Sequence, residues 1–136
     1  MKKQIMLYLM FLLAMLSGCS TEKSYLDVIR LNQAYIKLIN TYIGDLEKAD
    51  DAESVAEAMN RFADRLEPLW KDMEKMTEKY PELKEMETPP EPLRESFEQA
   101  EEMGRKMSGT IVKIMPYIED LEVRKAHQRL MSIMNL

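Results

Sequence analysis

The chain has 136 residues, 46% hydrophobic and 32% charged, which is enough for one packed domain and excludes a largely disordered chain. Only four glycines occur, and Glu, Lys, Met, Leu and Ala are abundant, which favours helix over sheet. Lys2 and Lys3 are the only charges before residue 19, so the remainder carries 17 Lys and Arg against 24 Asp and Glu. Its net charge of −7 makes nucleic acid an unfavourable partner, because phosphate groups are also negative.

Residues 1–18 have the pattern of a secretory signal peptide. Lys2 and Lys3 form a short positive segment, and residues 5–16 are an unbroken apolar run. Twelve residues of helix reach about 18 Å, which is well short of a hydrocarbon core of about 30 Å. We therefore predict a cleaved leader rather than a membrane span.

Leu16, Ser17, Gly18 and Cys19 follow this apolar run. The string resembles the lipobox of bacterial lipoproteins, in which a branched apolar residue and two small residues precede a lipidated cysteine. The resemblance implies cleavage between Gly18 and Cys19, a diacylglyceryl group on the Cys19 thiol and an acyl chain such as palmitate on its amino group. The alternative is an ordinary secretory leader with an incidental cysteine. Cys19 is the only cysteine, so we expect no disulfide.

A lipid on Cys19 would anchor the chain to a membrane outside the cytoplasm. Two or three acyl chains, at about 0.8 kcal/mol per buried CH₂, make such an anchor effectively permanent. By the same resemblance, Ser20 after the cysteine favours the outer membrane, facing the periplasm, in a Gram-negative cell. Residues 20–23 form a short tether that reaches at most about 14 Å, so the domain is expected to sit close to the bilayer.

Residues 24–136 are predicted to form one helical domain. The first helix is expected to begin at Ser24, with Asp27 completing its cap, and to end within residues 48–51. Its apolar residues recur every three or four positions and form one stripe. They include Tyr25, Val28, Tyr35, Ile39, Tyr42 and Leu46.

The second helix is expected to begin at Asp50, with Glu53 at the capping-box position, and to end near Tyr80 because Pro81 follows. Pro68 lies within it and predicts a bend. Its apolar stripe continues to the end of the helix. The stripe comprises Val55, Met59, Phe62, Leu66, Leu69, Met73, Met76 and Tyr80.

Residues 81–92 are a proline-rich linker, and Thr88 is expected to cap the next helix, with Glu91 as its partner. The following stripe runs from Leu93 to Leu121, with a kink expected at Pro116. Beyond Leu121 the stripe changes phase to Ala126, Leu130 and Ile133 or Met134, which indicates either a fourth helix or one long bent helix. The fold class is therefore an all-α, antiparallel up-and-down bundle of four helices, or of three with a long kinked last helix.

Few residues could carry chemistry. His127 is the only histidine, and no nucleophile pattern accompanies it, so we expect no enzyme and no catalytic residue. Two pairs of methionines share a helix face and could bind Cu(I), but such spacing is also typical of core packing. The tyrosines of the first helix could line a groove for a partner, or more commonly seal the core. The methionine pairs are Met73 with Met76 and Met103 with Met107. The acidic pairs Glu101-Glu102 and Glu119-Asp120 are expected to form a solvated helix face.

Three short strings resemble the small periplasmic b-type cytochrome family, a four-helix bundle that holds haem between a methionine and a histidine. They are residues 46–50 (Leu-Glu-Lys-Ala-Asp), 88–90 (Thr-Pro-Pro) and 126–129 (Ala-His-Gln-Arg). The resemblance implies the bundle fold and places His127 at the histidine ligand. The methionine ligand falls on Ile36, which cannot ligate iron, so the departure argues against haem but not against the fold.

The sequence thus predicts a lipid-anchored, non-catalytic binding or interaction module of the cell envelope. Its expected partners are the membrane, through the lipid on Cys19, and an envelope protein or a second copy of the chain. No cofactor other than that lipid is expected. The alternative is a periplasmic haem or copper carrier, for which His127 is the speculative metal ligand.

Overall fold

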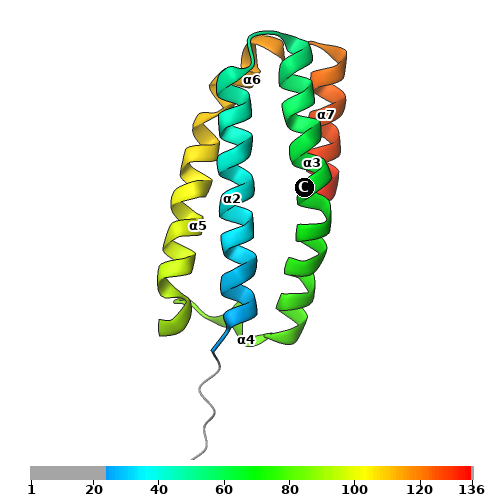
Figure 1. Cartoon of the computed structure of the whole chain (residues 1–136). Helices are drawn as coiled ribbons and strands as arrows, with labels where there is room; N and C mark the ends of the chain where they lie inside the picture. The colour runs from blue at the N-terminus through cyan, green and yellow to red at the C-terminus, as the bar shows by residue number, and fades with distance from the viewer. Residues whose placement is uncertain (1–23, 136) are drawn as a thin grey trace, which may run out of the picture.

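The computed structural model describes residues 24–135, and every regular element in that range is a helix (Figure 1). The predicted signal peptide, Cys19 and the tether lie outside the described residues. Four long helices form an up-and-down bundle, which confirms the predicted fold class. They are α2 (Leu26–Lys48), α3 (Ala52–Lys79), α5 (Glu91–Gly109) and α7 (Leu121–Ile133); the short elements are α4 (Glu82–Glu85), α6 (Ile111–Ile114) and the 3₁₀ helix η1 (Met115–Tyr117).

The helices α2 and α3 form the central pair of the bundle. The helix α5 packs on α2, and α7 packs on α3, whereas α5 and α7 make at most marginal contact. Because α7 has 13 residues and α3 has 28, α7 covers only about half of its neighbour. The C-terminal end therefore lies beside the middle of α3 (Figure 1).

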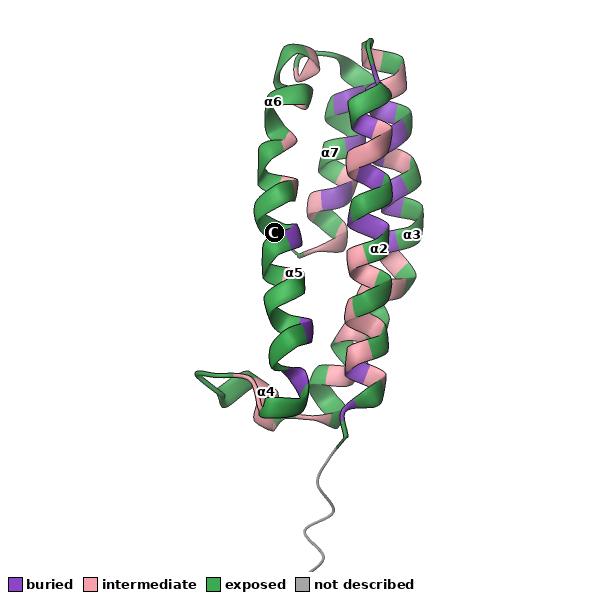
Figure 2. Cartoon of the chain, turned by 60° about the vertical axis from the view of Figure 1, so that its left-hand side comes forward, coloured by how far each residue is buried: buried purple, intermediate pink, exposed green. Residues whose placement is uncertain are grey.

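The main core lies in the half of the bundle that α7 covers. Ile39, Leu46 and Leu66 are fully buried there, and the rings of Tyr42 and Phe62 stack with centroids 4.3 Å apart. These positions confirm the predicted stripes of the first two helices. Figure 2 shows the buried positions gathered on α2, α3 and α7 in this half.

A smaller core closes the opposite end of the bundle. Tyr25, Val28 and Leu93 are buried together, and the side chains of Met76 and Leu83 pack against them. A polar contact also joins α2 to α5 near this smaller core: Asn32 Nδ2 on α2 donates a hydrogen bond of 3.0 Å to Ser96 Oγ on α5. The tether-side end of the bundle is thus packed, although α7 does not reach it.

The predicted caps of the first three helices are wrong by one or two residues. Tyr25, rather than Ser24, precedes α2, and no side chain caps that helix. Asp51, rather than Asp50, caps α3: the Ser54 N–H donates a hydrogen bond of 2.7 Å to Asp51 Oδ1, and Ser54, rather than Glu53, completes the capping box. Pro90 precedes α5 without a side-chain cap, so the expected cap at Thr88 is also wrong.

The two prolines that are expected to bend helices lie in different kinds of segment, Pro68 inside α3 and Pro116 in η1. The helix α3 continues through Pro68 and ends at Lys79, as expected from Pro81. The long C-terminal run does break, which confirms the four-helix alternative, but the break begins already at Thr110. Pro116 lies in η1, where its missing N–H cannot continue an α-helix, and Asp120 caps α7 by accepting from the N–H groups of Glu122 and Val123.

The predicted third stripe is only partly buried. Leu93 is buried, but Ile111 and Leu121 are 57% and 58% exposed. The reason is the break at Thr110, which turns the chain across the end of the bundle before α7 begins. No described helix combines the length and the apolar character that a membrane span requires.

Candidate functional site

The two positions registered on the cytochrome ligands do not form a ligand pair. His127 is exposed on α7, and Ile36 is half-buried on α2, two helices that make at most marginal contact. A haem iron would need a nitrogen or sulfur donor at each position, and isoleucine supplies none. These residues therefore do not fit a haem held in the manner of that family.

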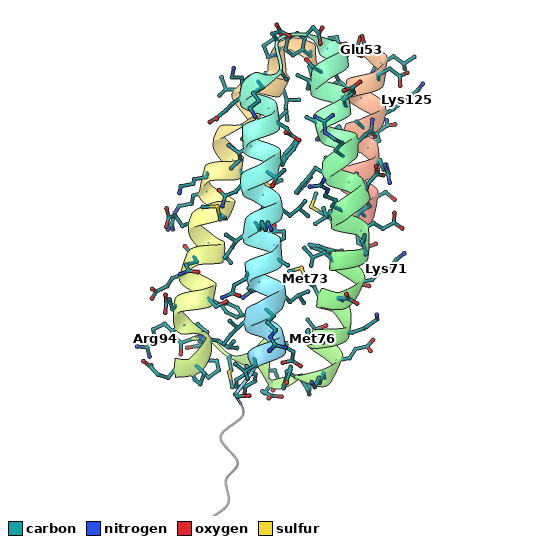
Figure 3. The ribbon with its side chains drawn as sticks, in the orientation of Figure 1. Glu53, Lys71, Met73, Met76, Arg94 and Lys125 are labelled. Atoms are coloured by element: carbon teal, nitrogen blue, oxygen red, sulfur yellow. The ribbon has the colours of Figure 1, made fainter. Side chains whose placement is uncertain are left out.

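The methionine pairs belong to the packing of the bundle. Met103 is buried and Met107 packs against the main core, while Met76 packs against the smaller one. Met73 and Met76 both lie on the α2 side of α3 in Figure 3. Lys71, Arg94 and Lys125, by contrast, point away from the bundle into solvent in the same view. Among residues 24–135, no three His, Cys, Asp or Glu side chains gather as a metal site.

The acidic pairs and the tyrosines also have structural roles. Glu101 and Glu102 form ion pairs of 2.8 Å with Arg105 and Lys106 one turn later on α5. Tyr42 is 3% exposed, and burial raises the pKa of its hydroxyl to about 12. The tyrosine positions of the first helix therefore line the core, as the more common interpretation of their spacing expects.

A hollow of about 430 Å³ lies where the end of α7 meets α3, beside Trp70 and Ile133. Three of its four charged side chains form ion pairs. Arg129 forms an ion pair of 2.8 Å with Asp64, and Lys71 forms one of 3.0 Å with Glu67. Glu74 is the fourth charged residue of the lining, and its carboxylate accepts a hydrogen bond of 3.4 Å from Asn135 Nδ2.

The most organised polar cluster lies at the end of the bundle where the tether joins α2. We call it the tether clasp: Tyr25, Asp27, Lys79, Tyr80 and Glu82. The Tyr80 hydroxyl donates a hydrogen bond of 2.9 Å to Asp27 Oδ1, and Lys79 Nζ forms an ion pair with Asp27 Oδ2. The Tyr25 hydroxyl donates one of 3.2 Å to Glu82 Oε1. The clasp therefore joins the start of α2 to the end of α3 and to α4.

Tyr25 gives the clasp its rigidity. Its backbone is in the left-handed region, with φ 48°, where non-glycine residues are uncommon. Its ring is 7% exposed and lies 5.0 Å from the Tyr80 ring, tilted by 57°. Packing of the ring stabilises a backbone conformation that would otherwise cost about 1–3 kcal/mol. Tyr25 is therefore held by ring packing against Tyr80, at the end of α3.

The charges of the clasp stabilise one another. The hydrogen bond from Lys79 has the largest effect and lowers the pKa of the Asp27 carboxyl below its ordinary value of 3.8. Desolvation has the second-largest effect and opposes it, while the hydrogen bonds from Tyr80 and from the Val28 N–H lower this pKa further. The same pair raises the pKa of Lys79 above 10.5. Both groups therefore stay charged at neutral pH.

The opposite end of the bundle carries a distal apolar patch. Its residues are Ile111, Val112, Met115 and Leu121, which are between 57% and 75% exposed. Ile111 and Val112 are adjacent in the four-residue helix α6, Met115 is the first residue of η1, and Leu121 is the first residue of α7. Clustered exposed side chains of this kind mark interaction surfaces more often than scattered ones do.

The chain matches no family model, and no curated protein or solved structure is significantly similar to it.

Sequence reasoning did not identify either cluster. Lys79 and Glu82 gave no sequence signal, because their partners are more than fifty residues away. The patch did leave a signal: residues 111–118, Ile-Val-Lys-Ile-Met-Pro-Tyr-Ile, contain more apolar residues than one helix face can bury. Only the break at Thr110 shows which of them face solvent.

The tether clasp predicts a specific dependence of stability on pH. A carboxyl whose folded pKa is lowered stabilises the fold above its unfolded pKa and loses this effect as the pH falls through the folded value. Asp27→Asn should therefore lower the unfolding free energy at pH 7, and its difference from the unsubstituted protein should shrink as the pH falls below about 4. Urea denaturation at several pH values measures this difference. A difference that stays the same at every pH would show that the charge of Asp27 does not stabilise the fold.

Proposed function

We propose that this protein is a lipid-anchored module of the bacterial cell envelope that binds a protein partner and catalyses no reaction. Its anchor is the acylated Cys19, and its localisation is the periplasmic face of the outer membrane if the cell is Gram-negative. The string Leu16-Ser17-Gly18-Cys19 supports the anchor by its resemblance to the lipobox. The specific partner is an envelope protein or a second copy of the chain.

The observation that carries the binding role is the placement of the distal apolar patch. The tether joins α2 at one end of the bundle, whereas α6, η1 and the start of α7 lie at the other (Figure 1). A rise of about 1.5 Å per residue gives α3, with 28 residues, a length of about 42 Å. An anchored bundle standing on its tether would thus present exposed Ile111, Val112 and Met115 to proteins well away from its own bilayer.

A catalytic role has no comparable support. The single histidine is exposed on α7, and Glu122, the one carboxylate within that helix, forms an ion pair of 2.8 Å with Lys125. In residues 24–135 every buried side-chain nitrogen or oxygen has a hydrogen-bond partner. Such a core is what a purely structural bundle requires.

The anchor is tested by substitution of the lipidated residue. Cys19→Ala should abolish incorporation of labelled palmitate and move the protein from the detergent phase to the aqueous phase in phase-separation experiments, since the thiol that accepts the lipid is missing. Ser17→Ala, which keeps a small residue before the cut, is the matched control and should be labelled normally. Labelled palmitate on the Cys19→Ala protein would contradict the proposal.

The binding role is tested by photocrosslinking in intact cells. A photoreactive benzoylphenylalanine at Val112 should give a discrete crosslinked product, whose mass identifies either a second copy or another envelope protein. The same group at Glu98, an exposed residue of α5, is the control. Ile111→Glu should reduce the product several-fold because it places a charge in the patch. If Val112 crosslinks no more than Glu98, the patch is not the binding surface.

A further inference from the structure

We propose that the tether-side end of the bundle is itself a lipid contact surface, in which Leu26 and Met86 touch the headgroup region of the anchoring bilayer and hold the bundle upright. The proposal rests on the lipid anchor at Cys19 proposed above. It adds a second membrane contact, made by the folded domain. Leu26 is 56% exposed and Met86 is 41% exposed.

The length of chain before the bundle limits how far this end can lie from the membrane. Residues 20–23 separate Cys19 from the first described residue, Ser24, and four extended residues reach at most about 14 Å. Leu26 is the first residue of α2, and Met86 directly follows α4, so both lie at the end where the tether joins the bundle (Figures 1 and 2). The tether does not hold the distal end of the bundle this close to the membrane.

The tether clasp joins the two segments that carry these side chains. Asp27 is bound to Lys79 and Tyr80, one residue after Leu26. The Tyr25 hydroxyl bonds to Glu82 at the start of α4, four residues before Met86. A short anchored tether also raises the effective concentration of the bilayer surface near these side chains. Two apolar side chains then suffice for the contact, which would be too weak to form if the protein were not anchored.

The charges around Met86 indicate which lipid this surface fits. Residues 82–87 contain three acids, Glu82, Glu85 and Glu87, and one base, Lys84. An acidic segment is repelled by the negative surface potential of anionic lipids, and salt screens that repulsion. The surface is therefore suited to zwitterionic headgroups, such as phosphatidylethanolamine, with the apolar side chains supplying the attraction.

The experiment uses the mature, lipidated full chain in vesicles of phosphatidylethanolamine and phosphatidylcholine. The lipid occupies the only native cysteine, so Met86→Cys introduces a single free thiol for an environment-sensitive fluorophore. The vesicles contain nitroxide lipids that quench fluorophores near the headgroups. The label at position 86 should be quenched strongly, and the same label on Val112→Cys, at the distal end, should not. Phosphatidylglycerol added at low salt should reduce the quenching at position 86.

A matched pair of substitutions separates membrane contact from folding. Leu26 and Leu121 are each the first residue of a helix, and they are 56% and 58% exposed. Glutamate is favourable at both positions because it lies at the positive end of the helix dipole. Leu26→Glu should reduce quenching of the label at position 86 several-fold, whereas Leu121→Glu should leave it unchanged.

Three outcomes would overturn the proposal. Equal quenching at positions 86 and 112 in lipidated protein would show that the tether-side end does not touch the bilayer, although the anchor exists. Fluorescence at position 86 that shifts to the blue without nitroxide quenching would show that a second copy covers this end. A mass spectrum without acyl groups on Cys19, recorded on the same sample, would refute the anchor itself and the inference with it.

Discussion

The contact between α2 and α3 is the constraint on which the remaining structure depends. Each of the other long helices packs on one member of this pair, α5 on α2 and α7 on α3, and they barely touch one another. Most of the fully buried large side chains, including Ile39, Leu46 and Leu66, come from the pair. Isolated helices of such lengths are marginal in water, so loss of this contact would leave α5 and α7 without a surface on which to fold.

The same constraint makes the two ends of the bundle different. At the tether side, the start of α2 and the end of α3 meet, and Tyr25, Asp27 and Tyr80 join them through hydrogen bonds and ring packing. At the distal side, the chain must cross from α5 to α7, and the crossing segment leaves Ile111 and Val112 in solvent. A membrane contact at one end and a protein contact at the other follow from these surfaces, and both remain proposals of function.

The helical fold and the buried faces of α2 and α3 were largely predictable from local pattern, because apolar residues spaced three or four apart lie on one face of a helix. Tyr42 and Leu46 are buried as their spacing predicts, and Pro81 ends α3. The caps were harder to predict, since Asp50 and Asp51 are equally good cap residues and only the path of the turn selects the second. The site was not predictable, because the bond between Asp27 and Tyr80 joins residues 53 apart in the sequence and depends on how the helices align.

The central claim is that the chain is anchored through one end and stands on it, and neutron reflectometry of the lipidated protein on a supported bilayer tests this most directly. An upright bundle should give a protein layer about 40–45 Å thick, close to the length of the 28-residue helix α3. A layer of about 20–25 Å, the thickness of two packed helices, would mean that the bundle lies flat. That result, or the absence of a bound layer, would contradict the account.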